Sequence, residues 1–248
     1  MITKYYRPET LEEALTLLGR PDTLPLGGGT LLSSLKSASV EVVDIQALEL
    51  NSIRKKGNNL EIGATTTLQQ LLESEAAPDA LKSAIKLEAP INIRNAATIA
   101  GTLVAADGRS TFTTVMLALD AKLKIQPNDE EFEIGNFLAF RNEYLHGKLI
   151  TAINISLNAK LAFESVARTP ADKPIVCAAL ASWPSGRTRL ALGGYGKAPL
   201  LAMDGTESDD LETAARNAFH EATNEWANAE YRMEMAATLT KRALEKII

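Results

Sequence analysis

The sequence predicts an α+β protein with two domains, and three observations lead to this prediction. The chain has 248 residues, which exceeds a typical single-domain length. Its first half mixes capped helix starts with short apolar strands, and its second half gives three strand patterns followed by two helices. The change of pattern near Asn158 predicts a first domain over residues 1–158 and a smaller second domain over residues 159–248.

The first predicted helix follows Thr10, which forms a capping-box pattern with Glu13. Leucine and alanine then recur at helical spacing, and Gly19 provides an end. A short apolar segment leads directly into three glycines. The strands expected in this part lie over residues 40–45, 53–56 and 60–62, and the last two predict a hairpin across Gly57-Asn58-Asn59.

The middle of the chain predicts helices and strands in alternation. Thr67 with Gln70 indicates a capped helix start, and a later helix is expected to end before Pro90. Residues 92–102 are rich in small side chains and give no clear assignment. The remaining patterns predict helices over residues 81–87 and 112–119, paired strands over 121–126 and 131–134, and a half-buried strand over 149–157.

The second half predicts a small sheet and two helices. Its strands are expected over residues 162–166, 175–182 and 187–192, with Pro184-Ser185-Gly186 as a tight turn. The helices are expected over residues 210–222 and 228–247, and the last carries an apolar stripe.

Composition excludes several functional classes. The net charge of -5 and the isoelectric point near 5.3 argue against a nucleic-acid surface, which needs clustered positive charge. The single cysteine, Cys177, excludes an intrachain disulfide and an iron–sulfur cluster held by this chain alone. It lies in an apolar run and is expected to be buried. No apolar stretch is long enough to span a bilayer, so the expected location is the cytoplasm.

Glycines mark the candidate binding segments. The first is Leu26-Gly27-Gly28-Gly29-Thr30-Leu31-Leu32, and the second is Ile93-Arg94-Asn95-Ala96-Ala97-Thr98-Ile99-Ala100-Gly101-Thr102. Glycine lets main-chain N–H groups approach a ligand closely, and such groups form anion-binding concavities. The first segment matches neither G-x-G-x-x-G nor a Walker loop. Taken alone, it is compatible with a plain tight turn or with a phosphate cradle.

Other chemistry-bearing residues form no recognisable catalytic group. His146 and His220 lack metal-ligand spacing and are expected at the surface. Ser110 lies in no nucleophile elbow, and Trp183 and Trp226 are expected to pack. Tyr195 is flanked by glycines, so its ring is expected either to cover a flat ligand or to pack on the core.

In this order the segments resemble the FAD-binding subunit of molybdenum hydroxylases, as in carbon monoxide dehydrogenase and xanthine dehydrogenase. The first segment is similar to the family motif A-G-G-x-S/T-x-L, and the second is similar to I-R-N-x-A-T-I-G-G-N. Further similarities are Leu60 to Thr66, Phe137 to Ile155, Arg168 to Pro174, Leu190 to Gly196 and Ala229 to Leu244. The resemblance therefore covers nearly the whole chain.

The resemblance implies a two-part FAD-binding domain of the molybdopterin dehydrogenase type, followed by a C-terminal domain with a three-stranded antiparallel sheet and helices. It implies FAD as cofactor, with partners that are a molybdopterin-binding large subunit and an iron–sulfur small subunit. Electrons would pass from the iron–sulfur clusters through FAD to NAD or another acceptor. The expected FAD contacts are Gly27, Gly28, Gly29, Thr30, Leu31, Thr65, Thr98, Ala100, Gly101, Thr102, Asp107, Thr111, Leu149 and Tyr195.

Several positions depart from the family pattern. Ala100 replaces a glycine, where a methyl would crowd a diphosphate if that position needs positive φ. Thr102 replaces asparagine, and Thr111 stands where the family has an Asp that contacts the flavin's sugar chain. Lys148 and Glu164 are further exchanges. These exchanges leave an alternative open: a scaffold subunit of the same fold that binds flavin weakly or not at all.

Overall fold

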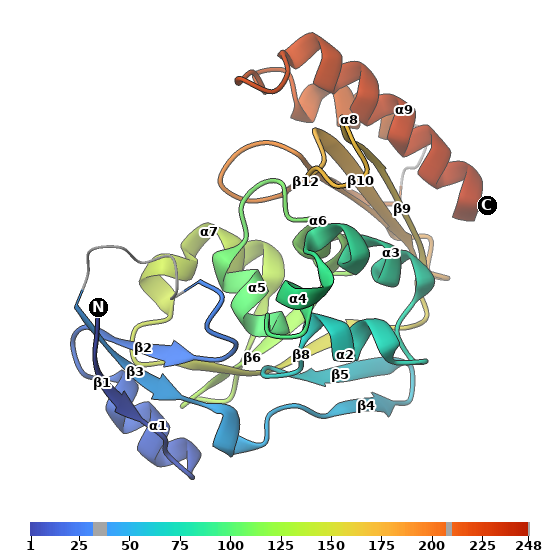
Figure 1. Cartoon of the computed structure of the whole chain (residues 1–248). Coiled ribbons are helices and arrows are strands. Elements are labelled where there is room, and N and C mark those ends of the chain that lie inside the picture. Colours follow the sequence, from blue (N-terminus) through green and yellow to red (C-terminus); the bar gives the residue numbers. More distant parts are fainter. Residues whose placement is uncertain (32–38, 207–209, 248) are drawn as a thin grey trace. The chain divides into compact units, whose positions relative to one another are not determined.

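The computed structural model describes residues 1–31, 39–206 and 210–247, and Figure 1 shows the order of the elements. The chain forms two compact units, each built from several segments. The first unit comprises Met1–Ser74, Pro90–Ala105 and Lys122–Asn154, and the second comprises Glu75–Ala89, Ala106–Ala121 and Ile155–Ile248. The domain division at Asn158 stays a prediction.

A small parallel sheet opens the first unit. Its strand order is β1 (Ile2–Tyr6), β3 (Val40–Asp44) and β2 (Thr23–Leu26). Helix α1 (Leu11–Leu18) buries Ala14, Leu17 and Leu18 in a cluster with residues of this sheet. The Thr10 hydroxyl accepts a hydrogen bond from the Glu13 amide at 3.3 Å, which confirms the predicted cap.

A five-stranded sheet forms the rest of the unit. Its order is β4 (Ile53–Lys56), β5 (Asn59–Gly63), β8 (Leu149–Ser156), β6 (Lys122–Gln126) and β7 (Glu130–Glu133). Both predicted hairpins are confirmed as antiparallel pairs. The prediction of a half-buried strand at β8 is wrong, because the first five residues of this central strand are all buried. The unit also contains η2 (Gln46–Leu48), α2 (Leu68–Glu73), α4 (Ile91–Arg94), α5 (Ile99–Ala105) and α7 (Ile134–Tyr144).

The second unit contains an antiparallel sheet of four strands among the described residues. The order is β12 (Leu200–Gly205), β11 (Thr188–Gly193), β10 (Val176–Ser182) and β9 (Lys160–Val166). Helices α8 (Leu211–Ala218) and α9 (Ala229–Ile247) cover one face, and α3 (Asp79–Glu88) and α6 (Thr111–Ala118) cover the other (Figure 1). Every residue of β11 is buried, as a strand covered on both faces requires.

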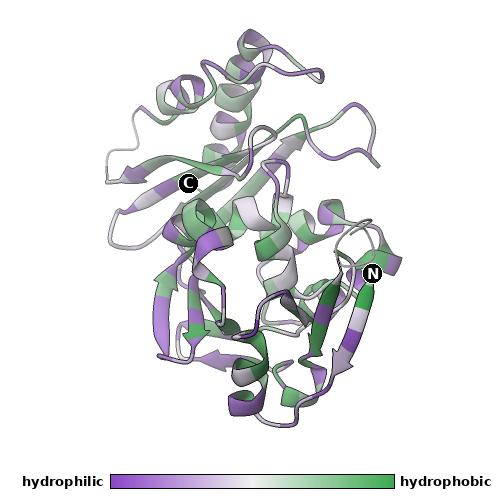
Figure 2. Ribbon diagram, turned by 90° about the vertical axis from the view of Figure 1, so that its left-hand side faces the viewer, coloured by the Kyte–Doolittle hydropathy of each residue, from purple (hydrophilic) through white to green (hydrophobic). Residues whose placement is uncertain are grey.

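The predicted α+β class is confirmed, with one correction to the second sheet. The sequence patterns indicate three strands, but β12 adds a fourth at the edge. Its apolar run, Leu200 to Met203, is only four residues long, and none of its residues is fully buried. Helices and strands of both units carry hydrophilic and hydrophobic residues side by side (Figure 2), as elements with one buried face do.

Candidate functional site

The glycine segment lies at the carboxyl end of β2, in the small parallel sheet. Ligands in open α/β sheets bind outside the carboxyl ends of parallel strands. The turn is held from the β3 side, since the Ile45 amide donates to the Leu26 carbonyl at 3.1 Å and Gln46 Nε2 donates to the Gly27 carbonyl at 3.1 Å.

The second segment packs directly against this turn. A Cβ placed on Gly28 would lie 1.7 Å from the Ala96 carbonyl oxygen, and one on Gly27 would lie 3.0 Å from Thr98 Oγ1. Only glycine permits backbones to approach so closely. The two segments are far apart in the sequence, and the structure brings them together within the first unit.

The amides of the glycine turn are open. Within the described residues, the N–H groups of Gly27, Gly28 and Gly29 donate to no protein acceptor. Gly29 has φ +69, a conformation that favours glycine. Thr30 and Leu31 continue the turn and are exposed, and Leu32 lies outside the described residues. Three successive amides without protein partners form the kind of concavity that binds an anion.

Backbone amides of the second segment already donate to protein acceptors. The Ile99 amide donates to the Thr66 carbonyl at 2.9 Å, and the Ala100 amide donates to the Ala64 carbonyl at 3.3 Å. The Gly101 amide donates to Thr98 Oγ1 at 3.1 Å. The Thr102 amide and hydroxyl both donate to the Thr98 carbonyl, at 2.9 and 2.8 Å. This segment therefore supports the glycine turn from behind.

The concern about Ala100 also disappears. Ala100 lies inside α5, and it is not among the described residues with positive φ. Its methyl group is nearly buried, at 9% exposure. A helical backbone accommodates alanine better than glycine, so this position does not require the glycine of the family motif.

Thr65 and Leu149 differ in what they offer a ligand. The Thr65 amide donates to the Leu50 carbonyl at 2.8 Å, while its hydroxyl makes no hydrogen bond within the described part of the chain. This hydroxyl is free for a polar ligand. The Leu149 side chain is 4% exposed and packs in the cluster around Leu17 and Val43, so it serves the core.

Asp107 and Thr111 lie in the second unit, where their side chains already have partners. Asp107 is exposed and pairs with Lys173 at 3.0 Å. Thr111 is fully buried, and its hydroxyl donates to the Ala84 carbonyl at 2.7 Å. Asp107 therefore remains accessible, whereas Thr111 presents no free polar group.

Sequence reasoning missed Glu88, the last residue of α3. Its Oε2 accepts from the Phe112 amide at 2.8 Å and lies 2.9 Å from Ser110 Oγ and 3.1 Å from Thr111 Oγ1. Burial raises the pKa of the Glu88 carboxyl above its ordinary value, although these polar contacts oppose the shift.

Tyr195 is partly buried and packs against the core of the second unit. The guanidinium carbon of Arg232 lies 5.3 Å from the centre of its ring. Gly194 and Gly196 on either side have φ +123 and +84, so the predicted glycine turn is present. The ring therefore packs on the core, which is one of the two possibilities that the sequence leaves open.

Cys177 is buried as predicted, and desolvation raises its thiol pKa to about 12, which makes it inert. His146 and His220 are exposed, as predicted. No group of three or more His, Cys, Asp or Glu side chains suited to a metal occurs in residues 1–31, 39–206 and 210–247. Among the helices that the structure describes, none is long and apolar enough to cross a bilayer.

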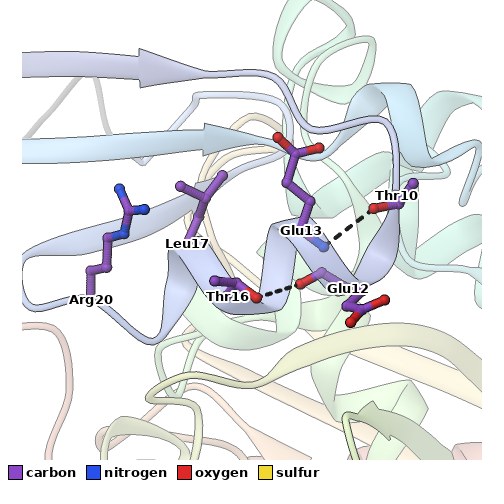
Figure 3. A pocket seen from close by; sticks show the side chains of 6 residues that line it. All are labelled: Thr10, Glu12, Glu13, Thr16, Leu17 and Arg20. Atoms are coloured by element: carbon purple, nitrogen blue, oxygen red, sulfur yellow. Dashed lines mark hydrogen bonds between the residues drawn. The ribbon is translucent and has the colours of Figure 1, made fainter.

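A hollow of about 380 Å³ lies beside α1, lined by Thr10, Glu12, Glu13, Thr16, Leu17 and Arg20 (Figure 3). Its two hydroxyls take part in bonds within the helix, with the Glu13 amide and the Glu12 carbonyl. These two hydroxyls are therefore not free for a ligand.

The geometry of the glycine turn defines a nucleotide-binding protein. Open amides suit a pyrophosphate, the missing Cβ atoms permit close approach, and the Thr65 hydroxyl in the same unit suits a hydroxyl-rich ligand. The chain belongs to the family described as the FAD binding domain in molybdopterin dehydrogenase, whose family model matches residues 1–156. It is accordingly the FAD-binding subunit of a dehydrogenase of the molybdenum hydroxylase type.

The chain is also similar to individual proteins. The chain is 30% identical over 227 residues to the uncharacterized protein YgfM of Escherichia coli strain K12, covering 88% of this chain and 86% of that protein. It is 25% identical over 273 residues to the glyceraldehyde dehydrogenase medium chain of Sulfolobus acidocaldarius, covering 98% and 97%. A chain of reconstituted CO dehydrogenase from Oligotropha carboxidovorans matches with a TM-score of 0.85 and 26% identity, covering 98% and 96%.

Proposed function

We propose that this chain carries electrons through FAD between an iron–sulfur subunit and a final acceptor, within a complex that also contains a molybdopterin-binding subunit. The observation that carries the proposal is the run of three open glycine amides at the end of β2, backed by the second segment. FAD supplies the redox chemistry when it is bound. The task of the chain is to bind, orient and shield it.

The proposed contacts follow from the accessibility of each group. The amides of Gly27, Gly28 and Gly29 bind the pyrophosphate, and the Thr65 hydroxyl binds a polar part of the nucleotide. Thr30, Leu31, Asp107 and Tyr195 stay predicted contacts, the first two beside the pyrophosphate and the last two with the sugar chain and the ring. The remaining predicted contacts are assigned to support of the turn (Thr98, Ala100, Gly101, Thr102) or to the core (Thr111, Leu149).

A separate iron–sulfur subunit follows from the cysteine content. The chain has one cysteine, and it is buried, whereas a cluster takes several thiolates. Electrons that reach FAD from a cluster must therefore come from another chain. The acceptor beyond FAD is proposed to be NAD or another soluble oxidant.

Flavin binding is tested by thermal unfolding of the apoprotein with and without FAD. A ligand that binds only the native state stabilises it by about 2.7 kcal/mol at a concentration 100 times its dissociation constant. AMP at the same concentration is the control, since it lacks the pyrophosphate and the flavin. An unchanged melting temperature at saturating FAD would favour the scaffold alternative.

The electron path is tested on the complex purified through a tag on this chain. The expected result is copurification of a larger and a smaller chain, with iron, molybdenum and flavin in fixed ratios. Addition of NAD to the reduced complex should restore the oxidised flavin spectrum. If oxygen or a quinone restores the spectrum and NAD does not, the NAD part of the proposal fails while the path from the clusters stands.

A further inference from the structure

Arg232 of α9 is fully buried, and its guanidinium binds backbone from three separate parts of the second unit. It donates to the Ala222 carbonyl at 2.8 Å, the Ala227 carbonyl at 3.0 Å and Asn224 Oδ1 at 2.9 Å, all in the loop between α8 and α9. Longer bonds of 3.4 and 3.5 Å reach the Ile175 carbonyl before β10 and the Gly194 carbonyl after β11.

The charge of Arg232 has no carboxylate ion-pair partner within the residues that the structure describes. Burial lowers the pKa of its guanidinium, and the nearby Arg109 charge acts in the same direction. A buried charge is costly unless hydrogen bonds replace its water. The carbonyl oxygens and the face of the Tyr195 ring do so here. Removing the guanidinium would leave several carbonyls without their donor.

The turn with Tyr195 is fastened to a second loop. The Gly108 amide donates to the Gly196 carbonyl at 3.0 Å, and the Gly194 amide donates to the Gly108 carbonyl at 2.6 Å. A Cβ on Gly108 would lie 1.9 Å from the Tyr195 carbonyl oxygen. Neither loop can therefore move without the other.

The loop between α8 and α9 carries Trp226, which is 36% exposed. The guanidinium carbons of Arg109 and Arg168 lie 4.7 and 4.5 Å from the centre of its ring. Arg109 in turn donates through Nε to the Pro174 carbonyl at 3.0 Å. The loops that carry Trp226 and Tyr195 thus belong to one hydrogen-bonded group. Arg232 donates hydrogen bonds to carbonyls of both loops.

We propose that Arg232 is a positioning residue that clamps the Tyr195 turn and the Trp226 loop into one preformed wall. The bonds that hold this wall are all made within the chain, so ligand binding should lose little conformational entropy in ordering it. Only one expectation rests on the proposed function, namely that this wall shields the flavin, because it depends on the predicted contact of Tyr195 with the flavin ring. The clamp itself is a property of the chain without ligand.

The clamp is tested in the apoprotein by acrylamide quenching of tryptophan fluorescence. The chain has two tryptophans, so Trp183→Phe leaves Trp226 as the reporter. Arg232→Met should raise the quenching constant about twofold, because a loop without its anchor opens locally. Arg232→Lys should give a smaller rise, since a point charge reaches fewer of the five acceptors.

The matched control is Arg189→Met. Arg189 is also buried, at 4% exposure, but it binds Asp120, Asp204 and the Leu117 carbonyl at the other end of β11. The Arg189→Met variant should have a lower melting temperature but unchanged quenching of Trp226 fluorescence. Unchanged quenching in Arg232→Lys, or an equal rise in Arg189→Met, would overturn the clamp. If Arg232→Met does not fold, the lysine variant decides.

The holoprotein tests the link to the flavin. Tyrosine in contact with flavin quenches its fluorescence, so Arg232→Met should make the bound flavin brighter, as Tyr195→Leu should. Brighter flavin in the Tyr195 variant alone would refute the role of Arg232 at the ring. If neither chain retains FAD, the proposed function fails, but the quenching of Trp226 in the apoprotein still decides the clamp.

Discussion

Replacing Gly28 with alanine tests the glycine turn with the smallest possible change. The new methyl would lie 1.7 Å from the Ala96 carbonyl oxygen and 2.5 Å from its carbonyl carbon. Both are backbone atoms, which no rotamer change can move. The turn and the second segment must therefore separate by about 1.3 Å to reach the 3.0 Å below which real Cβ contacts essentially never occur.

The expected cost has two parts. Overpacking of this kind destabilises a fold by about 1–3 kcal/mol. The same displacement moves the open amides of Gly27 and Gly29 relative to each other, so they no longer converge on one anion. Loss of about 1.4–2.8 kcal/mol of binding free energy raises the FAD dissociation constant about 10- to 100-fold.

The assay is FAD titration of the apoprotein by isothermal calorimetry, with melting temperature measured on the same samples. Gly57→Ala is the matched control, because Gly57 has φ +60 and no atom lies within 4 Å of the position that its Cβ would take. Gly57→Ala should lower the free energy of unfolding by about 1–2 kcal/mol and leave FAD affinity unchanged. Wild-type affinity in Gly28→Ala would refute the role of the turn as the pyrophosphate site.

Two further predictions concern Glu88 of α3 and Ala100 of α5. The raised pKa of Glu88 means that its protonated form contributes stability, which is fully present below the ordinary carboxyl pKa and is lost as pH rises through the raised value. Glu88→Gln should therefore flatten the fall of melting temperature with rising pH, and an unchanged slope would show that Glu88 is ionised throughout. Ala100→Gly should cost about 0.5–1 kcal/mol of unfolding free energy and leave FAD affinity unchanged. Tighter FAD binding in that variant would show that the methyl crowds the ligand after all.

Motifs and caps predict the parts of the fold that depend on local chemistry. Thr67 and Gln70 form the expected capping box, since the required partners lie within one turn of helix. The resemblance marks both segments as binding segments, but no local rule predicts that Gly28 meets Ala96, because the two residues are distant in sequence. The structure shows this contact and its reason, which is the absence of a Cβ at Gly28.

Elements without a strong apolar pattern could not be predicted in this way. Strand β1 exposes four of its five residues, and β12 is a partly exposed edge. Helix α7 follows β7 directly, with Glu133 as its N-cap and no side-chain capping bond. Such elements form because they pair and pack with residues that are distant in the sequence. A local sequence pattern does not contain that information.

The directions of the backbone amides give the two binding segments different roles. Sequence motifs show that glycine is present but do not show where each amide points. The amides of Ile99 to Thr102 bind protein carbonyls and the Thr98 hydroxyl, so the second segment is held by bonds within the chain. The first segment packs against it and keeps its glycine amides open. The exchanges at Ala100 and Thr102 fall in the supporting segment, where packing matters more than donors, so they are compatible with flavin binding.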